Sequence, residues 1–209
     1  YSGGMYLYYS NPIITNVTIS KNTAVGGGGI LLSFSNPTLT HVTIESNTAN
    51  EFGGMLLSSS NPTITNSIIW DNNPESINFA PASMFSSPNS IAINYSDIQG
   101  GEEGIVTNDN GEVYWLEGNI NTDPLFINPA NGDYSLHATS PCIDAGVAFF
   151  EIDSIGIIID LDESEYYGSA PDMGAYEYNP LTIEEQAIEI PTENVLHPAY
   201  PNPFNPVTT

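Results

Sequence analysis

The sequence has almost no basic residues. Among 209 residues there is one Lys, Lys21, and no Arg, against 25 Asp and Glu residues. A protein that binds nucleic acid needs clustered Lys and Arg to displace counterions from the phosphates, and an anionic membrane surface attracts the same clusters. We therefore exclude nucleic acid as a partner and do not expect binding to an anionic membrane surface.

Cysteine and long apolar runs are also scarce. The single cysteine, Cys142, allows no intrachain disulfide, and its apolar context predicts a buried structural thiol rather than a nucleophile. The sequence has no run of about 18 apolar residues, so we expect no membrane-spanning helix. It shows no signal peptide, and because it begins inside a repeat we interpret it as a fragment of a longer protein.

A repeat of 25 residues fills the first part of the chain. Gly-Gly begins at positions 3, 28 and 53, Asn-Pro at 11, 36 and 61, and Asn stands at 22, 47 and 72. Each copy holds two short apolar segments separated by Ser-Asn-Pro, in which Pro fixes φ and Asn tolerates turn backbone. The second segment alternates β-branched residues with Thr, which predicts a half-buried strand rather than a helix.

The repeat length predicts that each copy forms one coil of a β-helix. Its Gly, Pro and β-branched content excludes a helical repeat, it is too short for a propeller blade of about 40 residues, and it lacks the leucine-rich pattern. Coils stacked about 4.8 Å apart would place like residues over like. We expect inward columns at 7, 32 and 57, at 14, 39 and 64, and at 19, 44 and 69, an outward Thr column at 15, 40 and 65, and an Asn column at 22, 47 and 72 whose amides bond along the axis and tolerate left-handed backbone.

Seven motifs accompany the repeat. In order they are SIIWDN at 67–72, YSDIQGG at 95–101, GNI at 118–120, DPLF at 123–126, NGDYSL at 131–136, SPCIDAG at 140–146 and DMGAYEY at 172–178. The copies resemble the repeats of the pectate-lyase-like superfamily, and the motifs resemble the C-terminal module of bacterial right-handed β-helix repeat proteins of the choice-of-anchor type. This resemblance implies an all-β fold, a right-handed parallel β-helix with an irregular C-terminal β region and an extended tail. The family's Asp-x-Asp-Gly-x-x-Arg motif corresponds here to residues 160–165, which lack its Gly and Arg.

The end of the chain resembles an export signal. We expect three regular coils over residues 1–74, irregular coils and a cap over 75–180, an acidic linker over 181–195 and the start of a truncated sorting domain over 196–209. The string that carries the resemblance to the type A sorting domain of type IX secretion is Tyr200, Pro201, Asn202, Pro203, Phe204, Asn205 and Pro206. A module of flagellar hook-capping proteins opens similarly. The resemblance implies a secreted or cell-surface location, with the secretion and surface-anchoring machinery as partner.

The sequence offers no evident active site. Residues 1–70 contain no Asp, and their two acidic residues, Glu45 and Glu51, occupy different repeat positions. We expect both to be solvated, and Lys21 to be a solvated turn residue. His41 replaces Asn in its column and is interpreted as a tolerated substitution, and the three His residues are too scattered for a zinc site.

Two weaker binding signals remain. Aromatic side chains gather on the first coils and could stack on sugar rings; they are Tyr6, Tyr8, Tyr9 and Phe34. A later acidic group could hold Ca²⁺, although it lacks EF-hand spacing; it consists of Asp153, Asp160, Asp162, Glu163 and Glu165. Otherwise we expect no cofactor and no catalytic residue in this chain.

Three functions are compatible with these observations. The first is a non-catalytic secreted or surface scaffold, adhesin-like or contacting a polysaccharide. The second is the C-terminal part of a polysaccharide lyase or hydrolase whose active site lies upstream. The third is a carbohydrate-binding module. The fold alone does not choose among them.

Overall fold

The computed structural model describes residues 3–83, 86–153 and 156–180. One compact unit spans Tyr1–Tyr178, and a second, Asn179–Thr209, lies almost wholly outside the described residues. The predicted linker and sorting segment, including Tyr200–Pro206, therefore fall outside them. Within the described part the chain is all-β apart from two short 3-10 helices.

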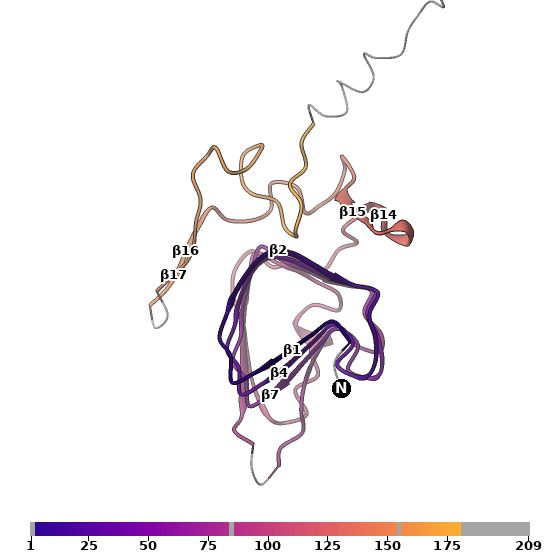
Figure 1. Ribbon diagram of the computed structural model, residues 1–209. Helices are drawn as coiled ribbons and strands as arrows, with labels where there is room; N and C mark the ends of the chain where they lie inside the picture. The colour runs from indigo at the N-terminus through magenta and orange to yellow at the C-terminus, as the bar shows by residue number, and fades with distance from the viewer. Residues whose placement is uncertain (1–2, 84–85, 154–155, 181–209) are drawn as a thin grey trace, which may run out of the picture. The chain divides into compact units, whose positions relative to one another are not determined.

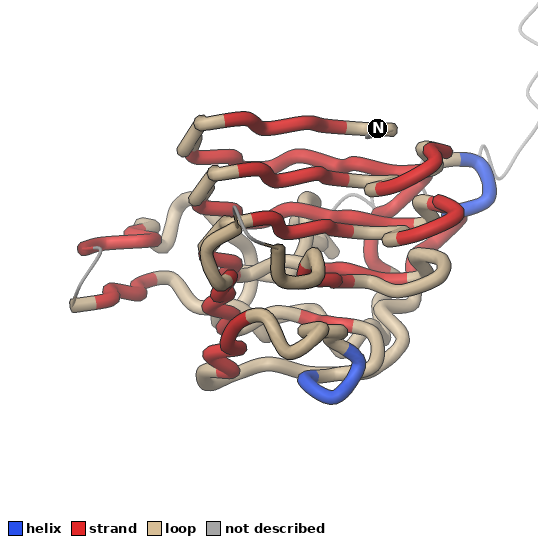
Figure 2. The backbone as a smooth tube through the Cα atoms, turned by 90° about the horizontal axis from the view of Figure 1, so that it is seen from below, coloured by secondary structure: helices blue, strands red, loops and turns tan. Residues whose placement is uncertain are grey.

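Successive coils of the chain stack as parallel strands. Figure 1 looks along the stack, where the coils overlay one another, and Figure 2 shows them from the side as layers. The strands of the coils are β1 (Met5–Tyr8), β2 (Ile13–Ser20), β3 (Thr23–Gly26), β4 (Ile30–Ser33), β5 (Thr38–Glu45), β6 (Thr48–Glu51), β7 (Met55–Ser58), β8 (Thr63–Thr65), β9 (Ile68–Trp70), β10 (Ile77–Phe79), β11 (Asn89–Asn94), β12 (Asp97–Ile98) and β13 (Gly111–Trp115). A short helix η1 (Glu102–Gly104) precedes β13. The predicted fold class, a parallel β-helix, is confirmed.

Three parallel sheets form the walls of the stack. The first has the order β1-β4-β7-β10, and a small one pairs β3 with β6. In the largest sheet, β2 pairs with β5 along its length. The first half of β5 pairs with β8, followed by β11 and β13, and its second half pairs with β9, followed by β12. Each sheet thus joins two or more coils, so that backbone hydrogen bonds hold neighbouring coils together.

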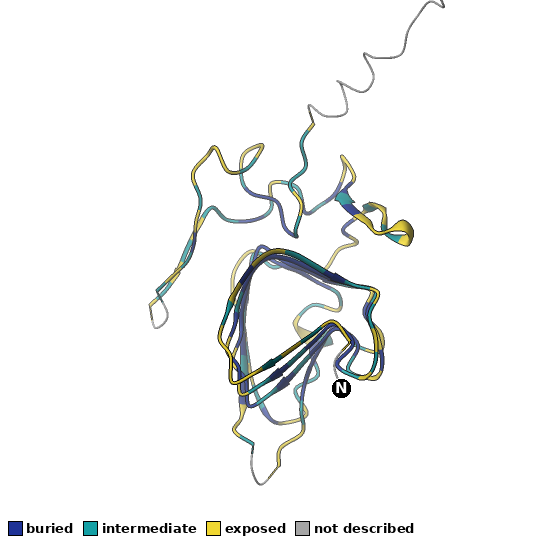
Figure 3. Ribbon diagram, in the orientation of Figure 1, coloured by how far each residue is buried: buried dark blue, intermediate teal, exposed yellow. Residues whose placement is uncertain are grey.

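The register between the first coils is the repeat length. Leu7 pairs with Leu32 and Leu32 with Leu57, and Ile19 pairs with Ile44 and Ile44 with Ile69. These side chains belong to one apolar cluster that fills the stack, seen as the dark strands of Figure 3. The predicted inward columns are therefore confirmed, because a constant offset places like residues over like.

The Asn column forms a ladder of side-chain amides. Asn22 donates from its backbone N and its Nδ2 to Oδ1 of Asn47, at 3.0 and 2.9 Å. Asn47 repeats both bonds to Asn72, each at 3.0 Å. The predicted amide stacking is confirmed, but the left-handed backbone lies one residue earlier, at Lys21 with φ 56° and Ser46 with φ 52°. The preceding residue thus makes the bend, and the Asn side chain of the next coil accepts a hydrogen bond from the backbone N at that bend.

The C-terminal part of the compact unit lies against part of the outer face of the largest sheet and is called the cover below. Its regular elements are β14 (Phe126–Asn128), helix η2 (Pro129–Asn131), β15 (Asp133–Leu136), β16 (Phe149–Ile152) and β17 (Gly156–Asp160). Irregular segments between and after them supply hydrogen bonds to the sheet, at Cys142, Val147 and Ala175. The pairs β14–β15 and β16–β17 are antiparallel. Outside the stack, Ile68 packs with Leu136, Cys142 and Met173 in a second apolar cluster.

This cover changes the expectation for the second strand of each coil. The strand was predicted to be half-buried, but β5 is buried at every position after Thr38. The outward Thr column is likewise covered, since Thr40 and Thr65 are buried and only Thr15 is exposed. Its hydroxyls are satisfied along the stack: Thr15 Oγ1 lies 2.8 Å from Thr40 Oγ1, and Thr65 Oγ1 donates to Asn94 Oδ1 at 2.7 Å.

The stacked core predicts a large difference between two Ile-to-Asp changes in the same sheet. Ile44 is 1% exposed and Ile13 is 78% exposed. Ile44→Asp should lower the free energy of unfolding by about 3–5 kcal/mol, because it buries an unpaired carboxylate between two coils. Ile13→Asp, the matched control, should change it by about 0.5 kcal/mol or less. Urea unfolding followed by tryptophan fluorescence measures both, and equal losses would contradict the stacked core.

Candidate functional site

A buried acid–thiol pair joins the stack to its cover. Asp97, on β12, accepts a hydrogen bond from the Thr122 amide at 3.2 Å and one from the Cys142 thiol at 3.3 Å. Both side chains are fully buried. Burial raises the pKa of Asp97 to about 7, and burial, with Asp97 beside it, raises the pKa of the Cys142 thiol. The prediction of a buried structural thiol is confirmed, and the pair tethers residues 122 and 142 to coil strand β12.

A buried His–Asn pair makes a second contact between stack and cover. Asn66 Nδ2 lies 3.1 Å from His41 Nε2 and donates to the Val147 carbonyl at 2.8 Å. Oδ1 of Asn66 accepts a hydrogen bond from the Val147 amide at 2.9 Å. The Asn66 side chain therefore bonds both backbone polar groups of Val147, as the backbone of a neighbouring strand would. Burial lowers the pKa of His41 to about 4, which keeps the imidazole neutral at pH 7. His41 is therefore part of this contact as well as a substitution in the Asn column.

Glu45 differs from the sequence prediction. Glu45 was expected to be solvated but is 3% exposed, because the outer face of β5 is covered. Its Oε1 accepts a hydrogen bond from Ser46 Oγ at 2.7 Å, and burial raises its pKa. Lys21 is an exposed residue in a bend, as expected, and its Nζ also donates to the Ala130 carbonyl at 2.6 Å. Glu51 is exposed, as expected.

The proposed calcium ligands do not gather into a site. Asp160 ends β17, and Glu165 Oε2 accepts a hydrogen bond from the backbone N of Asp162 at 2.9 Å. Within residues 3–83, 86–153 and 156–180, no group of three or more His, Cys, Asp or Glu side chains is placed to hold a metal ion. The geometry lends no support to Ca²⁺ binding at Asp153, Asp160, Asp162, Glu163 and Glu165, which stays a prediction.

The predicted aromatic residues do lie together. Tyr6, Tyr8, Tyr9 and Phe34, here called the aromatic cluster, form a continuous exposed group. The rings of Tyr9 and Phe34 stack at 4.8 Å with 3° between their planes. Tyr8 meets Tyr9 edge-on at 4.5 Å, and Tyr6 lies 6.1 Å from Tyr8. The four residues are the part of the predicted site that the structure brings together.

The stack of Tyr9 and Phe34 follows from the repeat. Both residues occupy the same position in neighbouring coils, directly after β1 and β4, and both have left-handed backbone, with φ of 48° and 50°. This bend directs equivalent side chains the same way, and the spacing between coils, about 4.8 Å, is the spacing of stacked rings. The third coil has Ser59 at this position, which limits the ring stack to two.

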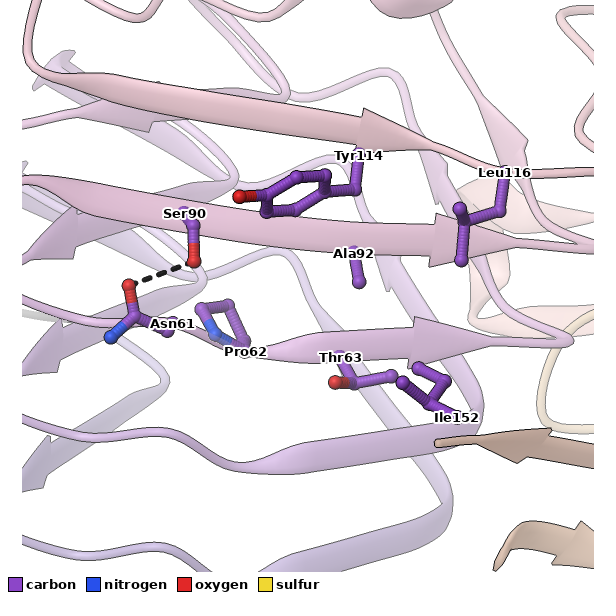
Figure 4. Close-up of a pocket in the computed structure, with 8 residues that line it drawn as sticks. All are labelled: Asn61, Pro62, Thr63, Ser90, Ala92, Tyr114, Leu116 and Ile152. Atoms are coloured by element: carbon purple, nitrogen blue, oxygen red, sulfur yellow. Dashed lines mark hydrogen bonds between the residues drawn. The ribbon is translucent and has the colours of Figure 1, made fainter. Parts of the chain in front are cut away.

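A second surface feature was not selected from the sequence. A cavity of about 390 Å³ lies on the outer face of the largest sheet, beside β16 (Figure 4). It is lined by Asn61, Pro62, Thr63, Ser90, Ala92, Tyr114, Leu116 and Ile152. A neighbouring cavity of about 440 Å³ shares Asn61, Ser90 and Tyr114 with it. Asn61, Pro62 and Thr63 belong to the third copy, whereas the other lining residues lie beyond it, where the spacing changes, so the repeat gave no signal that would align the two groups.

The comparisons with known proteins concern the coil stack. A family model described as "Right handed beta helix region" matches residues 1–142. A search of curated proteins and a search of solved structures gave no significant match. The described residues include no helix long and apolar enough to cross a membrane.

The Asp97–Cys142 pair predicts a pH dependence of stability. An ordinary Asp has a pKa of 3.8, whereas that of Asp97 in the folded protein is about 7. Between these values the folded state keeps a proton that the unfolded state has lost, so Asp97 contributes stability that disappears as the pH rises from about 4 to about 7. Relative to Asp97→Asn, wild-type protein should lose up to about 4 kcal/mol of unfolding free energy across this window.

His41 serves as the control, because its contribution to stability should change with pH in the opposite direction to that of Asp97. The pKa of His41 is lowered from 6.5 to about 4, so its contribution is lost as the pH falls through the same window. Relative to His41→Asn, wild-type protein should therefore gain stability as the pH rises from 4 to 6.5. Urea unfolding of wild-type protein and the two variants at pH 4, 5, 6 and 7 measures both differences. A difference in unfolding free energy between wild-type protein and Asp97→Asn that does not change with pH would contradict the raised pKa of Asp97.

Proposed function

Because the chain belongs to the right-handed β-helix family, we propose that it is a non-catalytic, secreted or cell-surface scaffold that contacts glycans through the aromatic cluster. The observation that carries this proposal is the exposed ring stack. Tyr9 is 64% and Phe34 38% exposed, although burial of such rings would stabilise the fold. A contiguous exposed aromatic group is typical of a binding surface.

The chemistry of the aromatic cluster fits a sugar chain. A sugar ring has an apolar face and polar edges, and the cluster offers aromatic faces together with three Tyr hydroxyls that can donate and accept hydrogen bonds. Formal net charge is −24, which repels anionic chains at low ionic strength. A neutral polysaccharide is the better partner on both grounds.

The placement of the ionisable groups favours a scaffold over an enzyme. Lys21 donates to a backbone carbonyl, while Asp97 and Glu45 are buried and bonded within the protein. Two alternatives remain, a fragment of a pectate-lyase-like lyase or hydrolase with its active site upstream and a carbohydrate-binding module. An upstream cluster of Asp with Arg or Lys on one strand face would favour the enzyme.

Export through the C-terminal tail completes the proposal. Its support is the Tyr200–Pro206 string, which resembles the opening of a type A sorting domain. The secretion and surface-anchoring machinery would be the partner of this tail.

Glycan binding should depend on the stacked rings. The double variant Tyr9→Ala/Phe34→Ala should lose at least about tenfold in affinity for neutral polysaccharides, because two stacking faces are removed. Tyr167→Ala, which removes a similarly exposed Tyr elsewhere, is the matched control and should bind as wild-type protein does. Affinity electrophoresis against neutral and acidic polysaccharides measures this, with circular dichroism as the test of folding. Unchanged binding by a folded double variant would reject the aromatic cluster as the contact.

Secretion should depend on the tail. Deleting residues 196–209 from the full protein in its own bacterium should leave it in the periplasm, because the secretion machinery would no longer recognise it. Cell fractionation with immunodetection measures this. A deletion variant that still reaches the medium or the cell surface would reject the sorting role.

A further inference from the structure

The cavity beside β16 exists because one small residue interrupts a column of larger ones. On the outer face of the largest sheet, Thr38 pairs with Thr63, Thr63 with Ala92, and Ala92 with Tyr114. Ala92 is the smallest side chain of this column, so its position forms the floor of a notch between Thr63 and Tyr114 (Figure 4). The notch, with its lining residues, is called the Tyr114 groove below.

The walls of the Tyr114 groove are apolar at one end. Leu116 and Ile152 line that end, and Pro62 borders the floor. Figure 4 shows the ring of Tyr114 extending along β11 toward Ser90, away from Leu116. The ring is 49% exposed and lines both neighbouring cavities, so it offers an aromatic surface at the centre of the hollow.

The other end of the groove is polar and carries both donors and acceptors. Ser90 Oγ donates to Asn61 Oδ1 at 2.9 Å, and the Tyr114 hydroxyl donates to Glu112 Oε2 at 2.8 Å. The amide of Asn61 supplies N–H donors, the carboxylate of Glu112 supplies acceptors, and the hydroxyls can do either. A ligand with several hydroxyl groups on its edge would find partners of both kinds.

An exposed row of amides continues the polar wall along the stack. The backbone N of Asn36 donates to Asn11 Oδ1 at 2.7 Å, and that of Asn61 donates to Asn36 Oδ1 at 2.8 Å. The row therefore leads from the first coil to Asn61 at the mouth of the groove. A chain-like ligand held in the groove would meet repeated polar groups beyond it.

Charge narrows the class of ligand. Glu112 is the single ionisable side chain other than Tyr114 among the described residues that line the two cavities, and the protein as a whole has a formal net charge of −24. An anionic sugar would be repelled by both. The apolar floor, the aromatic ring and the neutral amide and hydroxyl groups together match a ring that has an apolar face and uncharged polar edges.

We propose that the Tyr114 groove is a second carbohydrate site, which binds a pyranose unit of a neutral polysaccharide. The sugar ring stacks on Tyr114 above Ala92, and its hydroxyls bond with Asn61, Ser90 and Glu112. This site lies on the largest sheet, whereas the aromatic cluster belongs to β1 and to the bends that follow β1 and β4. Its occupation does not depend on the ring stack of Tyr9 and Phe34.

The test uses cellohexaose and mannohexaose as neutral probes and hexagalacturonate as the acidic one. Titration calorimetry gives the affinity, and methyl NMR signals of Ala92, Leu116 and Ile152 report the site. Tyr114→Ala should weaken neutral binding at this site at least about tenfold, because the stacking face is lost. Ala92→Leu, which fills the notch and keeps the ring, should weaken it as much. Tyr114→Phe, which keeps the ring and loses only the bond to Glu112, should cost about threefold.

The controls separate this site from the aromatic cluster. For Tyr9→Ala/Phe34→Ala, the affinity of the Tyr114 groove, followed by the methyl shifts, should stay within about twofold of the wild-type value. Tyr167→Ala should leave the affinities of both sites unchanged. If the double variant abolishes all binding, the groove is no independent site and the proposal is overturned. If the groove binds while the double variant has no effect, the aromatic cluster fails and this proposal stands.

Three further outcomes would overturn the proposal. The first is that neutral hexasaccharides, at a concentration on the order of 10 mM, leave the three methyl signals unchanged. The second is that Ala92→Leu, although folded, binds the neutral sugars as wild-type protein does. Hexagalacturonate, or an apolar peptide such as penta-leucine capped with lysine, could shift the signals at lower concentration than the neutral sugars, which would assign the groove to another class of ligand.

Discussion

The backbone register between successive coils is the constraint on which the rest of the structure depends. An offset of 25 residues places Leu over Leu, Ile over Ile and Asn over Asn. Parallel pairing fixes the spacing of the coils. This spacing brings the apolar side chains of the core, the Asn amides and the rings of Tyr9 and Phe34 into contact with their equivalents in the next coil. A shift by one residue would turn the core columns outward and leave the Asn amides without partners.

The cover over the largest sheet gives the buried polar groups their role. Asn66 bonds Val147 from both ends of its amide, and Asp97 holds the Cys142 thiol. Each contact spans the seam between coil and cover, where an unsatisfied polar group would cost about 1–3 kcal/mol. These groups therefore specify where the cover sits, while Ile68 and Met173 supply its apolar contact.

The two candidate binding surfaces arise from the repeat in opposite ways. The aromatic cluster forms where the repeat is regular, because Tyr9 and Phe34 occupy one position in adjacent coils. The Tyr114 groove forms where it has broken down, because Ala92 and Tyr114 stand in a column of β-branched residues. A solenoid exposes long faces whose columns can change one residue at a time without disturbing the core, so both surfaces are compatible with one fold.

The sequence by itself determined the coil, its register and its core, because a period of 25 residues with alternating apolar positions has one consistent stacking. It also grouped the four aromatic residues, which lie within two copies. Only the tertiary structure decided that Glu45 is buried, that His41 meets Asn66, and that Ala92 opens a hollow beside Tyr114. The burial of Glu45 depends on residues from beyond the repeat that fold back onto the outer face, and contacts between segments some 80 to 130 residues apart leave no periodic signal in a single sequence. His41 and Asn66 belong to adjacent coils, but their burial also depends on the segment that carries Val147. The pairing of Ala92 with Tyr114 lies beyond the third copy, where the spacing of 25 residues no longer gives the register.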